Sequence, residues 1–309
     1  MKVICGINKI QKFKKPVVAL GVFDGVHRAH RRILRAAAQE AQRIKGTSVV
    51  LTFWPHPQNK SILYSLEHRL RLISEVKIDV CIVIKFNKSF ARVSAEDFIK
   101  DILINKLGAN YICVGKNFRF GKCAGGDYKM LRGLSRIYNY RLKVFGIIRI
   151  NNQPISSTYI RRLITTGQLT NAQKLLARPV SILGTVIKGT GWGRRLGFPT
   201  ANIDPHNEVI PPAGVYAVKI FYHNKKFKGI TYIGGKPTFL RKKIKIKSQK
   251  LENIEVYIFN FKKNIYGENL EVQFINKIRD EKKFTNSLPL VRQIKKDITL
   301  AKMIFSLHN

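Results

Sequence analysis

The chain has 309 residues, of which 45% are hydrophobic and 10% aromatic, and 57 lysines and arginines oppose 18 acidic residues. This apolar content is enough to bury a core, which excludes a largely disordered chain, and the length predicts two domains rather than one. The longest unbroken apolar run, residues 80–84, is far too short to span a bilayer. The first residues lack the apolar segment of a secretory signal peptide, so we expect a cytoplasmic protein.

The excess of cations allows two interpretations. A net charge of +39 can mark a nucleic-acid-binding protein, or it can reflect a composition biased toward lysine. The basic residues are dispersed, and the densest run, residues 241–250, has six cations and no acid between two predicted strands. Because a solvated loop explains such a run, we expect no specific nucleic-acid partner, although phosphate-bearing ligands would be attracted to the surface.

Four cysteines, Cys5, Cys81, Cys113 and Cys123, show no CxxC spacing. Cys81 and Cys113 stand inside apolar runs, where a thiol usually packs as a small hydrophobic group. We therefore expect free thiols rather than disulfides or a zinc site.

The first half of the chain alternates two kinds of segment. Short apolar runs are typical of buried strands, and the segments between them carry apolar residues at helical spacing. The predicted strands are residues 16–20, 48–53, 80–86 and 111–114. The predicted helices are residues 31–44, 66–76 and 94–107. Alternation of this kind indicates an α/β fold with a doubly wound parallel sheet.

The pattern changes near Pro179. Strand-like segments then follow one another, separated by turn residues and with no convincing helix between them: residues 181–188, 214–222, 228–233, 254–261 and 270–275. Several short strands in a row predict an antiparallel barrel or sandwich. Only residues 287–306 have the spacing of a long helix. We therefore expect a first domain over residues 1–178 and a small β-barrel with a terminal helix over residues 179–309.

A cluster of chemistry-bearing residues follows the first predicted strand. Residues 21–30 read GVFDGVHRAH, which places His27 and His30 at the start of the predicted helix. The amino end of a helix at the carboxyl edge of a parallel sheet offers unpaired N–H groups and a positive dipole to phosphate. Two imidazoles there suit phosphoryl chemistry, whereas two surface histidines in a loop are the simpler alternative.

Four segments in chain order resemble one family. Residues 21–30 are similar to the HxGH signature of nucleotidyltransferases, and the others read TFWPHP (52–57), VGKNFRFG (114–121) and ISSTYIR (155–161). Together they resemble the bacterial bifunctional riboflavin kinase/FMN adenylyltransferases, also called prokaryotic FAD synthetases. This resemblance implies a Rossmann-like nucleotidyltransferase domain, which adenylylates FMN with ATP to give FAD and pyrophosphate.

The resemblance also implies roles for residues of this domain. His27 and His30 would be catalytic by holding the ATP phosphates, and an arginine beside hydroxyl donors suits a polyphosphate. The implied nucleotide-binding residues are Gly21, Phe23, Asp24, Gly25, Ser156, Ser157, Thr158 and Arg161. The implied flavin-binding residues are Phe53, Pro55, His56, Asn117, Phe118 and Phe120. The alternative for Phe118 and Phe120 is that they are core aromatics. The alternative for residues 156–161 is an ordinary N-capped helix.

A glycine-rich segment opens the second domain. Residues 189–202 read GTGWGRRLGFPTAN, which contains neither a P-loop nor a dinucleotide-binding pattern. A loop of this kind can cover phosphates, while Thr200 and Asn202 offer oxygen ligands suited to Mg²⁺. By spacing alone, a structural turn is the alternative interpretation.

This segment resembles the PTAN motif of riboflavin kinases. The resemblance implies that Thr200 and Asn202 bind Mg²⁺. It also implies nucleotide-binding roles for Gly189, Gly193 and Arg194.

Later segments continue the resemblance and supply further implied roles. They read IGGKPTF (233–239), IEVY (254–257), IYG (265–267) and IRDEKKF (278–284). Glu255 would be the catalytic base that activates the ribityl hydroxyl, and Arg279 would bind the flavin. The alternatives are an outward-facing strand carboxylate for Glu255 and simple pairing with nearby acids for Arg279.

Some positions depart from the family's pattern. In the first domain, Val22, Ala29 and Trp54 stand where Asn, Gly and Glu are usual. In the second domain, Tyr232, Tyr257 and Asn260 stand where Asn, His and Asp are usual. Thr200, Asn202 and Glu255 are intact, so the implied kinase chemistry is retained.

The sequence thus predicts a cytoplasmic bifunctional enzyme of flavin cofactor biosynthesis. The expected ligands are riboflavin, FMN, FAD and ATP, with Mg²⁺ as cofactor and no membrane or specific nucleic-acid partner. One alternative is a monofunctional riboflavin kinase whose first domain has lost activity, for which Val22 and Ala29 are the clue. The other is an RNA- or DNA-binding protein on a retained fold, supported only by the charge.

Overall fold

The computed structural model describes residues 1–57, 61–235 and 253–307. The chain forms two compact units, residues 1–159 and 160–309. The predicted domain boundary after residue 178 stays a prediction. The basic run at 241–250 and residues 236–239 of the IGGKPTF segment lie outside the described residues. Within the described ranges, no helix is long and apolar enough to cross a membrane.

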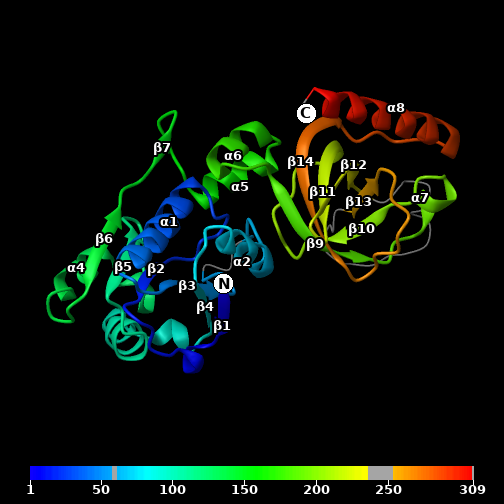
Figure 1. Ribbon diagram of the computed structural model, residues 1–309. Helices are drawn as coiled ribbons and strands as arrows, with labels where there is room; N and C mark the ends of the chain where they lie inside the picture. Colours follow the sequence, from blue (N-terminus) through cyan, green and yellow to red (C-terminus); the bar gives the residue numbers. More distant parts are fainter. Residues whose placement is uncertain (58–60, 236–252, 308–309) are drawn as a thin grey trace. The chain divides into compact units, whose positions relative to one another are not determined.

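The first unit is built on a six-stranded parallel sheet with strand order β1-β4-β3-β2-β5-β6 (Figure 1). Its strands are β1 (Lys2–Cys5), β2 (Val17–Leu20), β3 (Ser48–Trp54), β4 (Val80–Lys85), β5 (Tyr111–Gly115) and β6 (Arg141–Phe145). The predicted parallel sheet is confirmed, but periodicity misses the edge strands β1 and β6 because most of their residues are exposed or half-buried. The strand before residue 21 is therefore β2, inside the sheet.

Helices bury the inner strands of this sheet. Every residue of β2 is buried, and α1 packs on β2, β3 and β5. The α-helices of this unit are α1 (Arg28–Arg43), α2 (Leu66–Ser74), α3 (Ala95–Asp97) and α4 (Tyr128–Leu134), while α5 (Ser157–Thr165) begins in it and continues into the second unit. Shorter or wider helical turns are η1 (Ile7–Lys9), η2 (Phe90–Arg92), η3 (Phe98–Lys106) and η4 (Lys122–Ala124), and β7 (Arg149–Ile150) pairs with β8 (Gln153–Pro154).

Hydroxyl side chains begin two of these helices. Ser65 caps α2 by accepting a hydrogen bond from the His68 backbone N–H, and Ser94 caps α3 in the same way through Asp97. Such caps satisfy donors that a helix start leaves unpaired. The helix predicted over residues 94–107 begins at this cap and continues through α3 and η3.

The second unit contains a closed antiparallel barrel with strand order β10-β13-β12-β11-β14-β9. Its strands are β9 (Ser181–Ile187), β10 (Ala201–Asp204), β11 (Gly214–Tyr222), β12 (Lys225–Gly234), β13 (Asn253–Ile258) and β14 (Asn269–Arg279). The predicted barrel is confirmed. Two short elements were not predicted: strand β10, which directly follows Thr200, and helix α7 (Trp192–Arg195) inside the glycine-rich segment.

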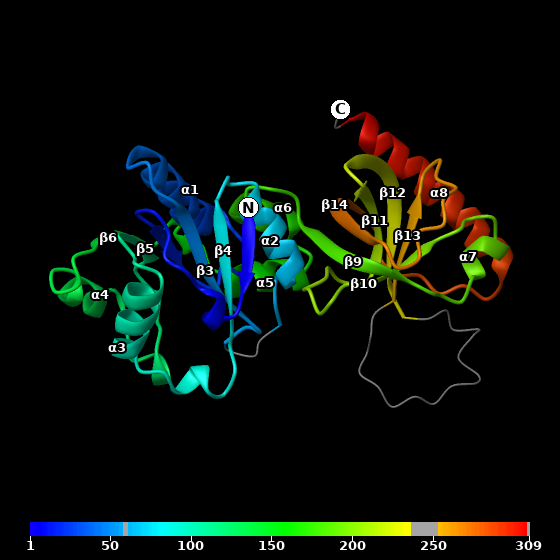
Figure 2. The same cartoon turned by 60° about the horizontal axis from the view of Figure 1, so that its bottom comes forward.

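Helix α8 (Ser287–Ser306) has the predicted bounds and lies across the barrel (Figure 2). Asn286 caps it by accepting a hydrogen bond from the Leu288 backbone N–H at 3.2 Å. Ala301 and Phe305 of α8 join one hydrophobic cluster with barrel residues of β11 and β12. A further helix, α6 (Leu169–Leu176), precedes β9.

Candidate active sites

The loop between β2 and α1 is held in an unusual backbone conformation. Phe23 and Val26 have φ angles of 53° and 38°, a left-handed region that costs energy for residues other than glycine. The Asp24 carboxylate is 2% exposed and accepts hydrogen bonds from the backbone N–H groups of Leu63 and Tyr64, at 2.9 and 3.3 Å from Oδ1. These contacts fix the loop against the segment that leads into α2.

The two histidines lie together at the start of α1. His27 is 3% exposed, and its Nδ1 accepts a hydrogen bond from the His30 backbone N–H at 3.4 Å. The two imidazoles stack with ring centroids 3.6 Å apart, and Phe23 meets the edge of His30 at 5.3 Å. Helix N-termini attract anions through free N–H groups and the helix dipole. The structure therefore brings both predicted histidines together at the start of a helix, a position chemically suited to an anion.

One of the two serines of the ISSTYIR segment contacts the same loop, and the other caps the start of α5. The Ser157 hydroxyl donates to the Asp24 carbonyl at 2.8 Å, and Ser156 accepts from the Tyr159 backbone N–H at 3.2 Å. Thr158 is exposed and Arg161 half-buried on α5. The structure thus brings the start of α5 to the loop that carries His27.

The residues predicted to bind flavin in this unit separate into two groups. Phe53 and Phe120 are each 6% exposed and belong to the hydrophobic core of the sheet. Phe118 is half-buried and stacks on Phe120 at 5.7 Å. Accessible surface is supplied by Pro55, His56, Asn117 and Phe118. Any contact of Phe53 and Phe120 with a ligand would therefore be small.

Arg69 is a residue at this site that the sequence analysis missed. Its guanidinium is buried beneath the loop and donates to the Val22 carbonyl at 2.6 Å and to the Phe53 carbonyl at 3.3 Å. Burial lowers the pKa of Arg69, and the nearby charge of Asp24 opposes that shift. The available signal was its place on α2, where Leu72 and Ile73, three and four positions later, are buried.

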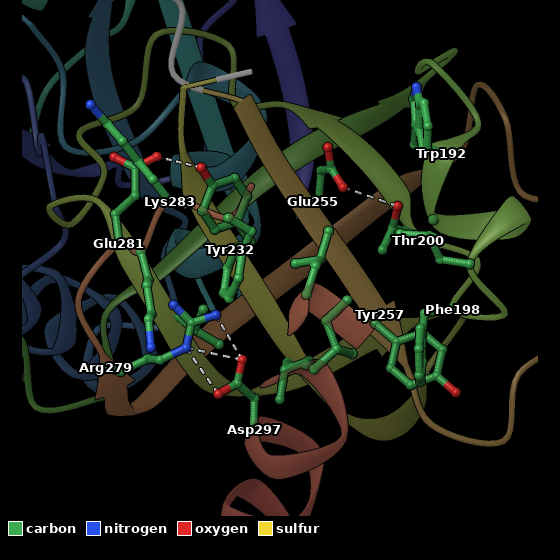
Figure 3. Close-up of a pocket in the computed structure, with 18 of the residues that line it drawn as sticks. Trp192, Phe198, Thr200, Tyr232, Glu255, Tyr257, Arg279, Glu281, Lys283 and Asp297 are labelled. Atoms are coloured by element: carbon green, nitrogen blue, oxygen red, sulfur yellow. Dashed lines mark hydrogen bonds and ion pairs between the residues drawn. The ribbon is translucent and has the colours of Figure 1, made fainter. Parts of the chain in front are cut away.

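The barrel unit contains a pocket of about 320 Å³ at α7, the barrel strands and α8 (Figure 3). Thr200 and Glu255 meet in its wall, where the Thr200 hydroxyl donates to the Glu255 carboxylate at 3.3 Å. Glu255 on β13 lies opposite Asn202 on β10 in the strand register. Side chains directly opposite on neighbouring strands share one face of a sheet. Strand pairing therefore gathers three oxygen-bearing side chains at one place.

Two glycines make room for these side chains. A Cβ on Gly189 would lie 2.0 Å from Asn202 Nδ2, and a Cβ on Gly193 would lie 2.8 Å from Thr200 Oγ1 and 2.4 Å from the Phe198 carbonyl oxygen. Real Cβ atoms do not approach so closely, so Gly193 must be glycine because the Phe198 carbonyl is backbone, and a Cβ at position 189 would displace the Asn202 side chain. The structure therefore explains these glycines by contact with Asn202 and Thr200.

A second part of the same pocket is organised by charged pairs. Arg279 on β14 binds Asp297 of α8 through two nitrogens, with Nη2 2.9 Å and Nε 3.0 Å from the carboxylate oxygens. Asp297 is 1% exposed and also accepts from Gln293 at 2.9 Å. Figure 3 shows this pair and the Thr200–Glu255 contact at separate parts of the wall.

Tyr232 and Glu281 form another contact in that wall. The Tyr232 hydroxyl donates to Glu281 at 2.5 Å, and the Gly235 backbone N–H donates to the same oxygen at 3.3 Å. Burial, and then the hydrogen bond to Glu281, raise the pKa of Tyr232. The phenol therefore stays protonated as a donor.

A neighbouring pocket of about 400 Å³ is lined in part by residues of the glycine-rich segment. Its lining includes the cations Arg194, Lys262 and Lys263 and the aromatic rings of Phe261 and Tyr266. Thr200 lines both pockets. The predicted residues Gly193, Thr200, Glu255 and Arg279 line the first pocket, and Arg194 lines the second. No sequence motif marked Asp297, Lys262 or Lys263.

These two constellations define the class of the chain: a two-unit protein with two stacked histidines at a helix start on an α/β sheet and a pocket in a β-barrel. The FAD synthetase family matches residues 9–159, which include His27 and His30. The riboflavin kinase family matches residues 176–305, which include Thr200 and Glu255.

Relatives match the whole chain. A bifunctional riboflavin kinase/FMN adenylyltransferase of Buchnera aphidicola subsp. Schizaphis graminum is 39% identical, covering 99% of this chain and 100% of the relative. One of Haemophilus influenzae is 34% identical over the same shares. A crystal structure described as a macrolide-efflux protein from Streptococcus pneumoniae is 27% identical, with a TM-score of 0.81 over 98% of this chain and 99% of that one. The chain belongs to the bifunctional riboflavin kinase/FMN adenylyltransferase family.

Proposed function

We propose that the chain makes FAD from riboflavin in two ATP-dependent steps. The barrel transfers a phosphoryl group from ATP to riboflavin and releases FMN and ADP. The sheet unit transfers AMP from a second ATP to FMN and releases FAD and pyrophosphate. The observation that carries this proposal is the presence of both constellations in one chain, each inside the family match for one step.

The two barrel pockets suit the two substrates of the kinase step. The cationic pocket with Arg194, Lys262 and Lys263 is chemically suited to ATP phosphates. The pocket with aromatic walls and Arg279 is suited to riboflavin. Because Thr200 lines both pockets, the γ-phosphate and the ribityl hydroxyl would meet there. Glu255, 3.3 Å from Thr200, would take the proton of that hydroxyl as general base.

The donor set near Thr200 also fits a magnesium ion. Mg²⁺ prefers oxygen ligands and binds through few protein groups together with substrate phosphates. Thr200 and Asn202 offer such oxygens, and Gly189 and Gly193 leave the space that these side chains occupy. We therefore assign Thr200 and Asn202 as the residues that would hold Mg²⁺, which when bound would neutralise developing charge on the phosphates.

The sheet unit would bind the second ATP at the start of α1. His27 and His30 would stabilise phosphate charge, and Ser156, Ser157 and Thr158 would complete the phosphate site at the start of α5. FMN would lie against the accessible residues Pro55, His56, Asn117 and Phe118. Catalysis would rest on positioning and electrostatic stabilisation, without a covalent enzyme intermediate. We propose a cytoplasmic location for both steps.

Chromatography of flavins after incubation with riboflavin and Mg-ATP tests the proposal. FMN should appear first and FAD should follow, while FMN supplied directly should also give FAD. FMN that accumulates without FAD would overturn the adenylylation step and favour the monofunctional kinase. Riboflavin that stays unchanged would overturn the kinase step.

A further inference from the structure

Arg69 is a buried cation beside the proposed adenylylation site. It is 2% exposed and is the largest of the fully buried side chains among the described residues. Within those residues, no carboxylate lies within salt-bridge distance of it, and its Nε has no hydrogen-bond partner. Burying a charge without a direct ion pair is costly. The contacts that Arg69 makes must therefore offset the cost of burying its charge.

The contacts of Arg69 join the ends of two neighbouring strands. Nη1 donates to the Val22 carbonyl, just beyond the end of β2, and Nη2 donates to the Phe53 carbonyl near the end of β3. The Thr52 hydroxyl donates to the same Val22 carbonyl at 2.9 Å. The guanidinium also lies over the Trp54 ring, 5.2 Å from its centroid. Two donors therefore fix the single carbonyl that precedes Phe23.

These contacts have a mechanical consequence. The loop from Gly21 to His27 carries two non-glycine residues at positive φ, a strained conformation that persists only when its surroundings hold it. Fixing the Val22 carbonyl fixes the peptide plane that leads into Phe23. Because the ring of Phe23 contacts His30 and the loop ends in His27, Arg69 acts on both histidines without touching them.

The contacts of Arg69 also have an electrostatic consequence. The Val22 and Phe53 carbonyls lie near the ends of β2 and β3, and free carbonyl oxygens there would repel a polyphosphate. Arg69 satisfies two of them and adds a positive charge, which acts strongly in a buried and poorly screened setting.

We propose that Arg69 is a positioning residue for adenylyl transfer: it holds the loop between β2 and α1 in the conformation that stacks His27 on His30. This inference rests on the proposed function of the sheet unit. Wild-type FAD formation tests that function, whereas the variants below test Arg69.

The experiment compares Arg69→Met, Arg69→Lys and Thr52→Val, with Arg71→Met as control on the exposed face of the same helix. FAD formation from supplied FMN should fall about 10²-fold in Arg69→Met, the scale of a site displaced by a distant change. Arg69→Lys should lose about 10-fold, because an ammonium keeps the charge but lacks the fork that reaches both carbonyls. In Thr52→Val, FAD formation should fall a few-fold, and in Arg71→Met it should stay unchanged. Riboflavin phosphorylation should stay unchanged in every variant.

Nuclear magnetic resonance separates positioning from general stability. Stacking at 3.6 Å places each imidazole in the ring current of the other, so the His27 and His30 signals should move in Arg69→Lys and stay in Arg71→Met. A folded Arg69→Lys with wild-type FAD formation, or with lower FAD formation but unmoved signals, would overturn the proposal. Should Arg69→Met fail to fold, Arg69→Lys and Thr52→Val decide the question by the same criteria.

Discussion

The two units build their sites in different ways. In the sheet unit, the site is a loop and two helix starts at the edge of parallel strands, and its shape depends on backbone conformation and on buried contacts such as those of Asp24. In the barrel, the site is made by side chains of neighbouring strands, and the pairing of Asn202 with Glu255 follows from strand register. A site on a loop needs support from elsewhere in the chain, whereas a site on paired strands is positioned by the pairing itself.

The largest expected effect is a loss of FAD formation from a change that affects the sheet site alone. The double variant His27→Ala with His30→Ala removes both imidazoles from the start of α1, so FAD formation from FMN should fall by about 10³-fold or more. Riboflavin should still become FMN, because that chemistry lies in the other unit. Separate assays with FMN and with riboflavin measure the two steps. Loss of both activities in a well-folded variant would show that the sites are not separable.

The reciprocal variant is Glu255→Gln, which keeps the shape of the side chain and removes the proposed base. Riboflavin phosphorylation should fall about 10²-fold or more, in the range of general base catalysis. FMN adenylylation should persist as the internal control. Near-normal FMN formation would remove Glu255 from this role.

Asp297 tests how far the barrel site also depends on buried support. Asp297→Asn removes the charge that holds Arg279, so the free energy of unfolding of the barrel should fall by about 2 kcal/mol. Chemical denaturation measures this change. Asp280→Asn is the matched control, because Asp280 pairs with Lys277 at the exposed surface, where an ion pair contributes little. Equal effects from both variants would contradict the assignment.

Thiol chemistry distinguishes the units without mutation, since all four cysteines precede residue 160. Burial raises the pKa of Cys81 and Cys113 to about 12. Only the thiolate reacts, so at pH 8 both stay protonated and hidden. A thiol reagent should modify the exposed Cys5 and Cys123 in the native protein and all four thiols in denaturant. Rapid reaction of four thiols in native protein would mean that the sheet opens readily.

The smallest expected effect concerns the barrel alone. A fragment that begins at Leu176 should fold and convert riboflavin to FMN within about twofold of the full chain, since a unit with its own core can fold independently. Circular dichroism and the flavin assay measure both properties. An insoluble or inactive fragment would show that the barrel needs preceding residues, and would move the domain boundary away from residue 178.

Much of this architecture could be predicted from the sequence because it depends on local patterns. Apolar runs locate the buried strands, and residues 287–306 have the spacing of the helix that the structure shows. An edge strand such as β6 escapes detection because alternating polar and apolar residues leave no long apolar run. The motifs locate His27 and Glu255, but not Arg69 or Asp297. In the sequence, each of these two charged residues is typical of a surface position. Only tertiary packing buries it and brings its hydrogen-bond partners from distant parts of the chain.

Closure of the barrel constrains the order in which the chain can fold during synthesis. The sheet's last strand, β6, ends at Phe145, so the parallel sheet can assemble while the rest of the chain is still being made. Closing the barrel requires β9 to pair with β14, with Ser181 opposite Gln273, and such distant pairing is slow. A chain interrupted before β14 would carry a complete sheet beside strands with unpaired edges, the form most prone to aggregate.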